Sequence, residues 1–322
     1  MKALRLCLLA LALGAASQAT GQGYPAKPVR LIVPYPAGGS GDIVARAVAQ
    51  KMSESFGQQV IVDNRPGANG NIGTEQVAKS AADGYTLLLA TDIQFAISPN
   101  TTPKLPYDPE KDFDPVSLVA FLELILAAHP SLAANNVRAL VALARTQPGK
   151  INYASTGPGS THHLSIELLK SLGGFDLTHV PYKGSSQALP DLIAGQVQLM
   201  QLGIPQTLPH LKAGRLKALG VASAKRLAVL PDVPTIAEQG FPGYEANNSW
   251  NLYAPAGTPK TVVAKLHAEI VRVVALADVR ERFTATGLEP VGSTPEQLAA
   301  RMRDDRAKWA RVIREAGIKI EP

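Results

Sequence analysis

Two glycine-rich loops constrain the fold of this 322-residue chain more than any other feature. The first loop, residues 34–42, follows an apolar run at 29–33, and the second, residues 155–163, follows a similar run at 151–154. An amphipathic segment comes after each loop. Because strand–loop–helix units of this kind build layered α/β folds, their recurrence predicts two similar α/β lobes.

Further short β-branched runs alternate with helical patterns around each loop. In the first lobe we expect strands at 29–33, 60–62 and 85–89 and helices at 42–56 and 73–82. In the second we expect strands at 151–154, 179–180, 197–199 and 216–222 and helices at 161–172 and 187–194. The elements predict an α/β chain of two lobes.

The C-terminal part reads as helical and has no strands of its own, so we expect it to return to the first lobe. Thr258 followed by Pro259 predicts one helix start, and Thr294, Pro295 and Gln297 predict a capping box. The chain then crosses between lobes near 118–128 and near 244–254, which makes a hinge of two crossover strands. The expected boundaries are 24–121 for lobe 1, 122–246 for lobe 2 and 247–322 for the return.

Residues 1–23 are predicted to be a secretory signal peptide. Lys2 and Arg5 precede an apolar run at 6–16, and small residues follow, with cleavage expected between Ala19 and Gly23. An apolar run this short does not span the ~30 Å of a bilayer core, which argues against an anchor. The single cysteine, Cys7, would leave with the peptide, so thiol chemistry and disulfides are excluded from the mature chain.

The charge balance argues against nucleic acid as a partner. Loss of Lys2 and Arg5 lowers the number of basic residues from 32 to 30, against 26 acidic ones, and the net charge from +6 to +4. The basic residues are scattered and not interleaved with aromatics. Phosphate-loop and zinc-helix motifs are absent, so no cofactor and no metal are expected.

Both loops suit the binding of anions. Glycines let a ligand approach the backbone, and a helix N-terminus offers free N–H groups and a partial positive charge. Facing one another across a cleft, the loops would hold a carboxylate from both sides. The alternative is two tight turns, with Ser40 or Asp42 only capping a helix and His162 and His163 lying on the helix surface or packing behind the site.

A rival interpretation is an exported serine hydrolase that uses Ser160 with His162 or His163. It would need a carboxylate to orient the histidine, for which Asp176 or Asp191 is available without supporting spacing. Neither Ser40 nor Ser160 stands in a Gly-x-Ser-x-Gly nucleophile elbow.

Eight motifs, taken in order, resemble the tripartite tricarboxylate transporter substrate-binding proteins, the periplasmic receptors of Bordetella-type bacteria. The resemblance covers essentially the whole mature chain. Its motifs are residues 28–39 with Asp42, 64–68, 83–88, 107–113, 152–157, 179–184, 230–235 and 254–259.

The resemblance implies a two-lobed, type II-like periplasmic binding protein that closes on a small organic acid and presents it to a membrane permease. It implies a monomeric receptor without catalysis. A receptor that senses a ligand without uptake would use the same lobes, and that alternative stays open.

The resemblance also assigns ligand-binding residues by position, with one carboxylate held by the two loops. The first wall would comprise Tyr35, Ala37, Gly38, Ser40 and Asp42, and the second Ser155, Gly159, Ser160, Thr161 and His162. Thr91, Gln94 and Tyr182 with Lys183 would lie near the mouth.

This chain departs from the family pattern at two places expected to line the distal end of the cleft. Gln201 and Leu202 stand where the family commonly has phenylalanine and an acidic or polar residue, and Asn251 and Leu252 follow Trp250 where the family often has phenylalanine and glycine. Without an acidic residue there, we expect a carboxylic acid or a neutral polar ligand and not an amine.

Overall fold

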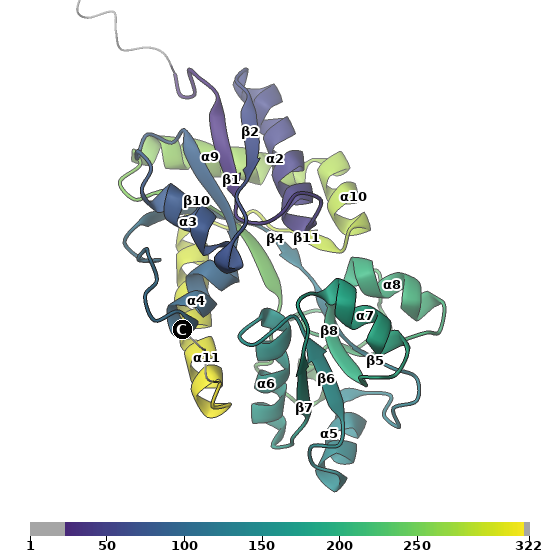
Figure 1. Ribbon diagram of the computed structural model, residues 1–322. Coiled ribbons are helices and arrows are strands. Elements are labelled where there is room, and N and C mark those ends of the chain that lie inside the picture. Colours follow the sequence, from purple (N-terminus) through teal and green to yellow (C-terminus); the bar gives the residue numbers. More distant parts are fainter. Residues whose placement is uncertain (1–22, 319–322) are drawn as a thin grey trace, which may run out of the picture.

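The structure, a computed structural model, describes residues 23–318 and consists of two lobes, each built on one β-sheet (Figure 1). Cys7 and all but the last residue of the predicted signal peptide lie outside the described residues. The two-lobed α/β architecture predicted from the alternating pattern is confirmed.

The first lobe contains a six-stranded sheet in the order β11-β4-β10-β3-β1-β2. β1 pairs in parallel with β2 and β3, whereas β10 runs antiparallel between β3 and β4. Its strands are β1 (Val29–Val33), β2 (Val60–Asn64), β3 (Thr86–Thr91), β4 (Phe113–Leu122), β10 (Asn248–Pro255) and β11 (Leu288–Pro290). Its helical segments are α2 (Ser40–Phe56), η2 (Ala68–Gly70), α3 (Asn71–Ala78), η3 (Ile93–Ile97), α4 (Ser98–Thr101), α9 (Lys260–Ala275) and α10 (Ala277–Ala285).

The second lobe contains a five-stranded sheet in the order β7-β6-β8-β5-β9. Its strands are β5 (Leu124–Ala128), β6 (Asn152–Ser155), β7 (Thr178–Pro181), β8 (Leu199–Gly203) and β9 (Lys217–Val221). Its helical segments are α5 (Val137–Thr146), α6 (Thr161–Gly173), α7 (Ser185–Ile193), α8 (Ile204–Lys212) and η4 (Ala237–Gln239). In both lobes a glycine-rich loop joins the carboxyl end of a parallel strand to a helix. Each loop therefore lies where the parallel strands of its sheet end.

The two predicted crossovers are present. β4 of the first sheet continues into β5 of the second with Glu123 alone between them, and the chain returns from the second lobe into β10. The Glu123 N–H donates to the Gly287 carbonyl of the first lobe at 3.3 Å, and the Glu123 carbonyl accepts from the Ile204 N–H of the second at 3.2 Å. One peptide segment is thereby hydrogen-bonded to both lobes.

A buried carboxylate organises the second crossover. Asp92, at the end of β3, accepts hydrogen bonds from the Ser249 N–H at 2.9 Å, from the Ser249 hydroxyl and from Asn251 Nδ2 at 3.2 Å. Burial raises the pKa of Asp92 to about 6, despite the opposing charge of Arg301. These bonds attach the start of β10 to its neighbouring strand.

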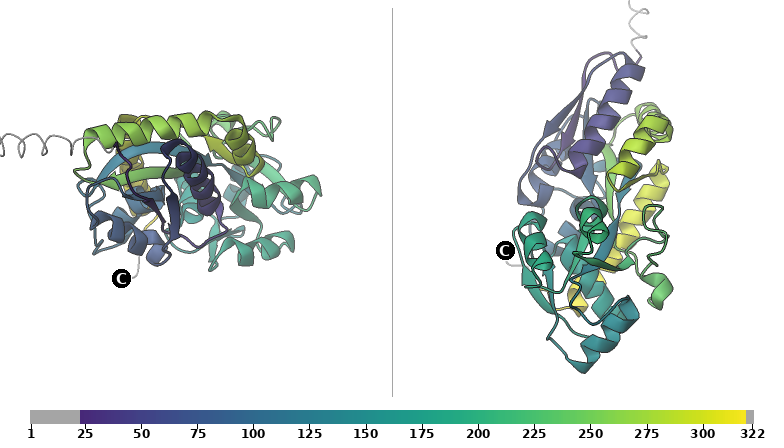
Figure 2. Two further views of the ribbon diagram at one scale, coloured as in Figure 1. Left: turned by 90° about the horizontal axis from the view of Figure 1, so that it is seen from above. Right: turned by 90° about the vertical axis from the view of Figure 1, so that its right-hand side faces the viewer.

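The last helix, α11 (Pro295–Glu315), packs against both lobes. The sequence predicted that it returns to the first lobe, and Leu298 and Met302 do pack there. Trp309, Val312 and Ile313 instead join the core of the second lobe. Figures 1 and 2 show the helix running along the side of the molecule from one lobe to the other. Its 21 residues make it long enough to reach both cores.

Of the two predicted helix starts, one is formed as expected. The Thr294 hydroxyl accepts from the Gln297 N–H at 3.2 Å and the Gln297 side chain accepts from the Thr294 N–H at 3.0 Å, with Pro295 as the first helical residue. At α9, however, the N-cap is Pro259, and the Thr258 hydroxyl donates to the Pro255 carbonyl at 2.7 Å. The turn before α9 satisfies that hydroxyl locally, so it does not cap the helix.

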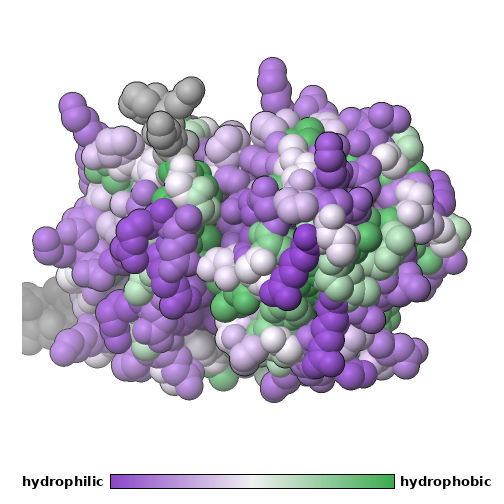
Figure 3. Space-filling view, turned by 90° about the horizontal axis from the view of Figure 1, so that it is seen from below, coloured by the Kyte–Doolittle hydropathy of each residue, from purple (hydrophilic) through white to green (hydrophobic). Residues whose placement is uncertain are grey.

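The surface carries few large apolar side chains. Six such residues of the described chain are exposed, namely Ile61, Ile72, Leu172, Val229, Val271 and Val291. Seen from below, polar side chains dominate the face and apolar ones form only small patches between them (Figure 3). Among residues 23–318, no helix combines the length and apolar character needed to cross a membrane.

The close approach of the lobes at Gly287 gives a testable consequence. Gly287 has φ +66°, and a Cβ there would lie 2.8 Å from Ile204 Cβ and from Pro205 Cδ. We expect Gly287→Ala to lower the free energy of unfolding by about 2–5 kcal/mol, because a left-handed alanine costs ~1–2 kcal/mol and overpacking costs ~1–3 kcal/mol.

Gly57→Ala is a matched control. Gly57 has φ +65° with nothing within 4 Å of the added methyl, so this variant carries only the backbone cost of about 1–2 kcal/mol. Urea unfolding of both variants measures the difference. Equal losses would show that the lobe contact at Gly287 is not tightly packed.

Candidate functional site

A cleft of about 920 Å³ lies between the lobes, with walls from both. This volume is at the upper end of the ~300–1,000 Å³ of small-molecule sites. Both glycine-rich loops contribute, as do the end of β3, the start of β10 and the segment before α7. The lining residues are Tyr35, Pro36, Ala37, Gly39, Ser40, Gly41, Asn69, Thr91, Ile93, Leu122, Thr156, Gly157, Pro158, Gly159, Ser160, Thr161, His162, Lys183, Gly184, Ser185, Ser186, Asn248 and Trp250.

The first loop presents the N-terminus of α2 to the cleft. The N-cap is Gly39, which has no side chain to cap the first turn, and Ser40 and Gly41 line the cleft directly. First-turn N–H groups have no partner within a helix, so they are available to a ligand.

Asp42, expected in the first wall, lies behind it and supports the loop. Its Oδ2 accepts from the Gly38 N–H at 3.1 Å and from Arg46 Nε at 2.8 Å. The hydrogen bond from Arg46, opposed by burial, keeps the pKa of Asp42 below its usual value, so the side chain stays ionised. Gly38, also expected in the wall, is not among the lining residues; its N–H is used for this internal bond.

An aromatic pair forms the floor of this wall. The rings of Tyr35 and Trp250 meet edge to face with centroids 5.4 Å apart. A Cβ at Gly41 would overlap the indole of Trp250, so only glycine allows the ring and the helix start to approach this closely. The buried Trp250 Nε1 lacks a hydrogen-bond partner among residues 23–318.

Tyr35 is held in position by two of the other predicted residues. Its hydroxyl bonds with Thr91 Oγ1 at 2.8 Å and accepts from Gln94 Nε2 at 2.8 Å. Thr91 lines the cleft, whereas Gln94 is fully buried behind it and also bonds to the carbonyl of Asn69. Gln94 therefore positions Tyr35 and Asn69 and does not itself reach the cleft.

The second loop presents the N-terminus of α6. Ser160 is the N-cap, with its hydroxyl accepting from the His163 N–H at 3.2 Å. The Thr161 hydroxyl donates to Asn248 Oδ1 at 3.0 Å and so joins the loop to the start of β10. Gly159, Ser160, Thr161 and His162 all line the cleft, as the sequence predicted for the second wall.

Ser155, by contrast, is fully buried beneath the loop. Its hydroxyl bonds with His179 Nε2 at 2.6 Å and accepts from the Gly157 N–H at 3.0 Å. The rings of His163 and His179 stack with centroids 4.0 Å apart. This layer supports the loop from below and has no contact with the cleft.

A third helix N-terminus, which the sequence analysis did not single out, also faces the cleft. The N-cap of α7 is Gly184, again without a capping side chain, and Lys183, Gly184, Ser185 and Ser186 line the wall. The indication in the sequence was a glycine and two serines directly after a strand, the same arrangement as in the other two loops. Tyr182 turns away, and its hydroxyl donates to Asp191 at 2.7 Å.

Gln201, expected at the distal end of the cleft, is not among its lining residues. It lies within β8, a strand that begins two residues later than predicted, and its side chain is fully buried. Gln201 pairs with Leu126 of β5, well inside the sheet. Gln201 departs from the family pattern, but its position in β8 places its side chain in the interior of the lobe.

The electrostatics of the cleft favour anions. Lys183 is the only charged residue among the lining residues and no acidic side chain joins it. Burial lowers the pKa of His162 to about 4, so this ring is neutral at physiological pH and hydrogen-bonds to Thr156 Oγ1 at 3.0 Å. The positive potential therefore comes from three helix N-termini and one lysine.

The residues of the rival hydrolase are not assembled. Within the described chain, Ser160 caps α6 and is not bonded to His162, whose Nδ1 is occupied by Thr156. His163 Nδ1 accepts from the Gly159 N–H at 3.1 Å. The proposed orienting carboxylates are engaged elsewhere, Asp176 with Lys170 and Asp191 with Tyr182. The predicted nucleophile Ser160 is thus not bonded to either predicted base, as such catalysis requires.

Comparison with known proteins connects this geometry to a family. The chain is 39% identical to the protein BugT of Bordetella pertussis over 309 residues, 96% of this chain and 95% of that protein. Among solved structures, Rpa4515 of R. palustris with adipate gives a TM-score of 0.79 at 38% identity, covering 92% of this chain and 99% of that one. MatC of Rhodopseudomonas palustris with bound malate gives 0.74 at 34% identity, covering 90% and 100%.

Residues 44–318 match the family described as the tripartite tricarboxylate transporter family receptor. The match spans most of both lobes and α11. One solved relative, 36% identical with a TM-score of 0.75, is described as the periplasmic binding protein BugD. With more than a third of its residues identical to BugT over nearly the full length, the chain belongs to the tripartite tricarboxylate transporter receptor family.

Proposed function

We propose that this receptor binds a small dicarboxylate in the cleft between its lobes. The observation that carries the proposal is the convergence of three helix N-termini, those of α2, α6 and α7, on one cleft without an acidic side chain. Such termini bind carboxylates through backbone N–H groups and the helix dipole. The relatives crystallised with adipate and with malate, both dicarboxylates, support the same ligand class.

The arrangement of the cleft suggests separate positions for the two ends of the ligand. One carboxylate lies between the first turns of α2 and α6, where Ser40, Gly41 and Thr161 contribute donors. The other is held at the start of α7 by Lys183 and Ser185. Tyr35, Trp250 and Ile93 pack on the carbon chain between them.

Binding then acts through closure of the lobes. A ligand that bonds to both walls has a higher affinity for the closed arrangement and shifts the population toward it. We propose that the protein is exported by its signal peptide, works as a periplasmic monomer without catalytic activity and delivers its ligand to a permease of the tripartite tricarboxylate type. Sensing without uptake would use the same binding step.

Calorimetric titration tests the ligand class. We expect saturable binding of adipate or malate and at least tenfold weaker binding of adipamide, which has the length of adipate but no charge. The reason is that helix dipoles and Lys183 stabilise an anion and not a neutral amide. Binding of neutral or cationic ligands alone would contradict the proposal.

Lys183 provides a test of the second carboxylate position. Lys183→Met keeps the length of the side chain and removes its charge, so we expect about five- to tenfold weaker binding of adipate, corresponding to ~1 kcal/mol for an exposed pair. Butyrate has a single carboxylate, which would be held between α2 and α6. We therefore expect Lys183→Met to weaken the binding of butyrate less than twofold.

Lys212→Met is the matched control for the Lys183 variant. Lys212 is exposed at the end of α8 in the same lobe and does not line the cleft, so the variant changes the net charge equally. An equal loss of affinity for adipate in both variants would mean that Lys183 acts only through the overall charge of the protein.

The titrating groups of the cleft predict a flat pH profile. His162 has its pKa lowered to about 4 and Asp42 has its pKa below the usual value, so neither changes charge between pH 6 and 8. We expect the affinity for adipate to vary less than twofold over that range. Stronger binding at pH 6 than at pH 8 would indicate that His162 gains a proton when the ligand binds.

A further inference from the structure

A second pocket lies at the hinge, outside the proposed carboxylate cleft. Its volume is about 260 Å³, just below the usual range for small-molecule sites, and it shares no lining residue with the cleft. One wall comes from α10 and β11 of the first lobe and the other from the segment after β9 in the second. The lining residues are Glu123, Ile204, Lys225, Arg226, Leu227, Ala228, Val229, Arg280, Thr284, Gly287, Leu288, Glu289 and Pro290.

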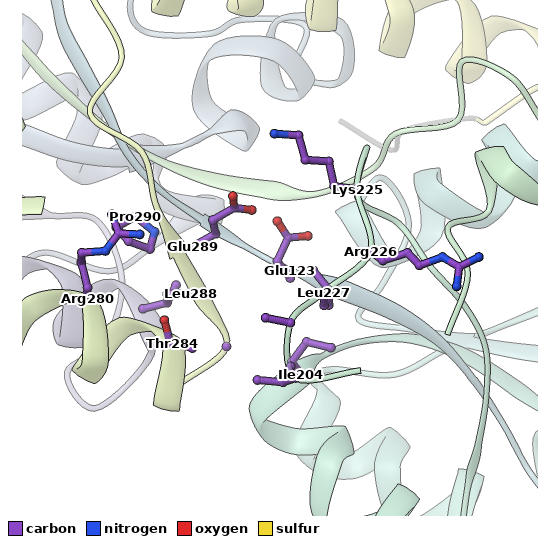
Figure 4. A pocket seen from close by; sticks show the side chains of 13 residues that line it. Glu123, Ile204, Lys225, Arg226, Leu227, Arg280, Thr284, Leu288, Glu289 and Pro290 are labelled. Carbon is purple, nitrogen blue, oxygen red and sulfur yellow. The ribbon is translucent and has the colours of Figure 1, made fainter. Parts of the chain in front are cut away.

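Glu123, the residue between β4 and β5, is the central polar group of this pocket. Only 4% of it is exposed, and its Oε2 has no hydrogen-bond partner among the described residues. A buried carboxylate without a partner is costly, so this atom calls for an explanation. Figure 4 shows the Glu123 side chain directed toward Glu289 of β11, with the two carboxyl groups facing each other.

Three basic residues, Lys225, Arg226 and Arg280, also line the pocket. Within residues 23–318 neither Glu123 nor Glu289 forms an ion pair, and Arg226 points outward to Glu238 at 2.9 Å. Glu245, which also faces the pair, is bonded to Arg301 at 3.0 Å. Burial, then the nearby charge of Glu289, raises the pKa of Glu123 to about 8, so at neutral pH a proton takes the place of a cation.

Part of the remaining lining is apolar, beside the polar side chains of Lys225, Arg226, Arg280 and Thr284. Ile204, Leu227 and Leu288 are buried, and Val229 adds an exposed apolar edge. The pocket thus combines two facing carboxyl groups with a surface suited to a short hydrocarbon chain. A group of three or more metal-ligating side chains does not occur within the part of the chain described, which disfavours a metal ion.

We propose that this hinge pocket binds a small alkylammonium ion, with the ammonium group between Glu123 and Glu289 and the alkyl chain against Ile204, Leu227 and Leu288. Binding displaces the proton of Glu123 into solvent, and the ammonium takes its place. Because the walls come from both lobes around the residue whose backbone joins them, the site exists only while the lobes keep this relative arrangement.

Titration with n-butylammonium chloride at constant ionic strength tests the proposal, using n-butanol as a neutral ligand of equal size. At pH 8 we expect saturable binding of the amine and at least tenfold weaker binding of the alcohol. At pH 6 the amine should bind about 50-fold more weakly than at pH 8, because a proton must then leave Glu123. Equal binding of the alcohol, or absence of saturable amine binding, would overturn the proposal.

Three variants locate the site. Glu123→Gln and Glu289→Gln should each weaken amine binding at least fivefold, and Glu123→Gln should also remove most of the pH dependence. Glu281→Gln, which removes the same charge from an exposed residue of α10 that does not line the pocket, should bind as wild type. Unchanged affinity in the first two variants would overturn the assignment, as would complete displacement of the amine by calcium chloride.

Adipate titration of the same variants keeps this test separate from the proposed function. Glutamine resembles the neutral form of Glu123 in shape, so Glu123→Gln is expected to fold and to bind adipate. Amine binding without adipate binding would support the hinge site and contradict the proposed carboxylate site in the cleft. Adipate binding without amine binding would overturn only the hinge site.

Discussion

Glu123 is the residue on which the arrangement of the two lobes depends. It is the single residue between the last strand position of one sheet and the first of the other, and its backbone donates to Gly287 and accepts from Ile204. A peptide bonded on both sides cannot move without breaking one of these bonds. The connection between β4 and β5 is therefore short and tied to both lobes, as the hinge segments of two-domain proteins are.

The second constraint at the hinge comes from buried polar groups. Asp92 holds the start of β10 through Ser249 and Asn251, and it lies next to the charges of Arg301 and Asp305 on α11. Since α11 also inserts Trp309 into the core of the second lobe, the helix connects the buried network of one lobe with the apolar core of the other. The two crossover strands and this helix together limit which directions of closure are accessible.

The cleft is electropositive without a basic patch. Three helices begin there, and two of them have a glycine N-cap, so that no side chain competes with a ligand for the first-turn N–H groups. Asp42, Gln94 and Ser155 lie one layer behind, where they hold the loops in place through hydrogen bonds. This division explains why a chain with a net charge of only +6 can present an electropositive cleft. Backbone dipoles act locally, whereas the net charge is spread over the whole surface.

The sequence by itself determined the two lobes, the two crossovers and the loops that line the cleft, because strand periodicity, glycine placement and helix starts are local properties. The family followed from a resemblance carried by eight motifs in order. Nine of the predicted residues line the cleft, namely Tyr35, Ala37, Ser40, Thr91, Gly159, Ser160, Thr161, His162 and Lys183. Only the tertiary structure decided that Asp42, Gln94, Ser155 and Gln201 lie behind it, that α7 adds a third helix start and that α11 spans both lobes. Those outcomes depend on which elements meet in space, and contacts between distant segments have no local pattern from which they can be read.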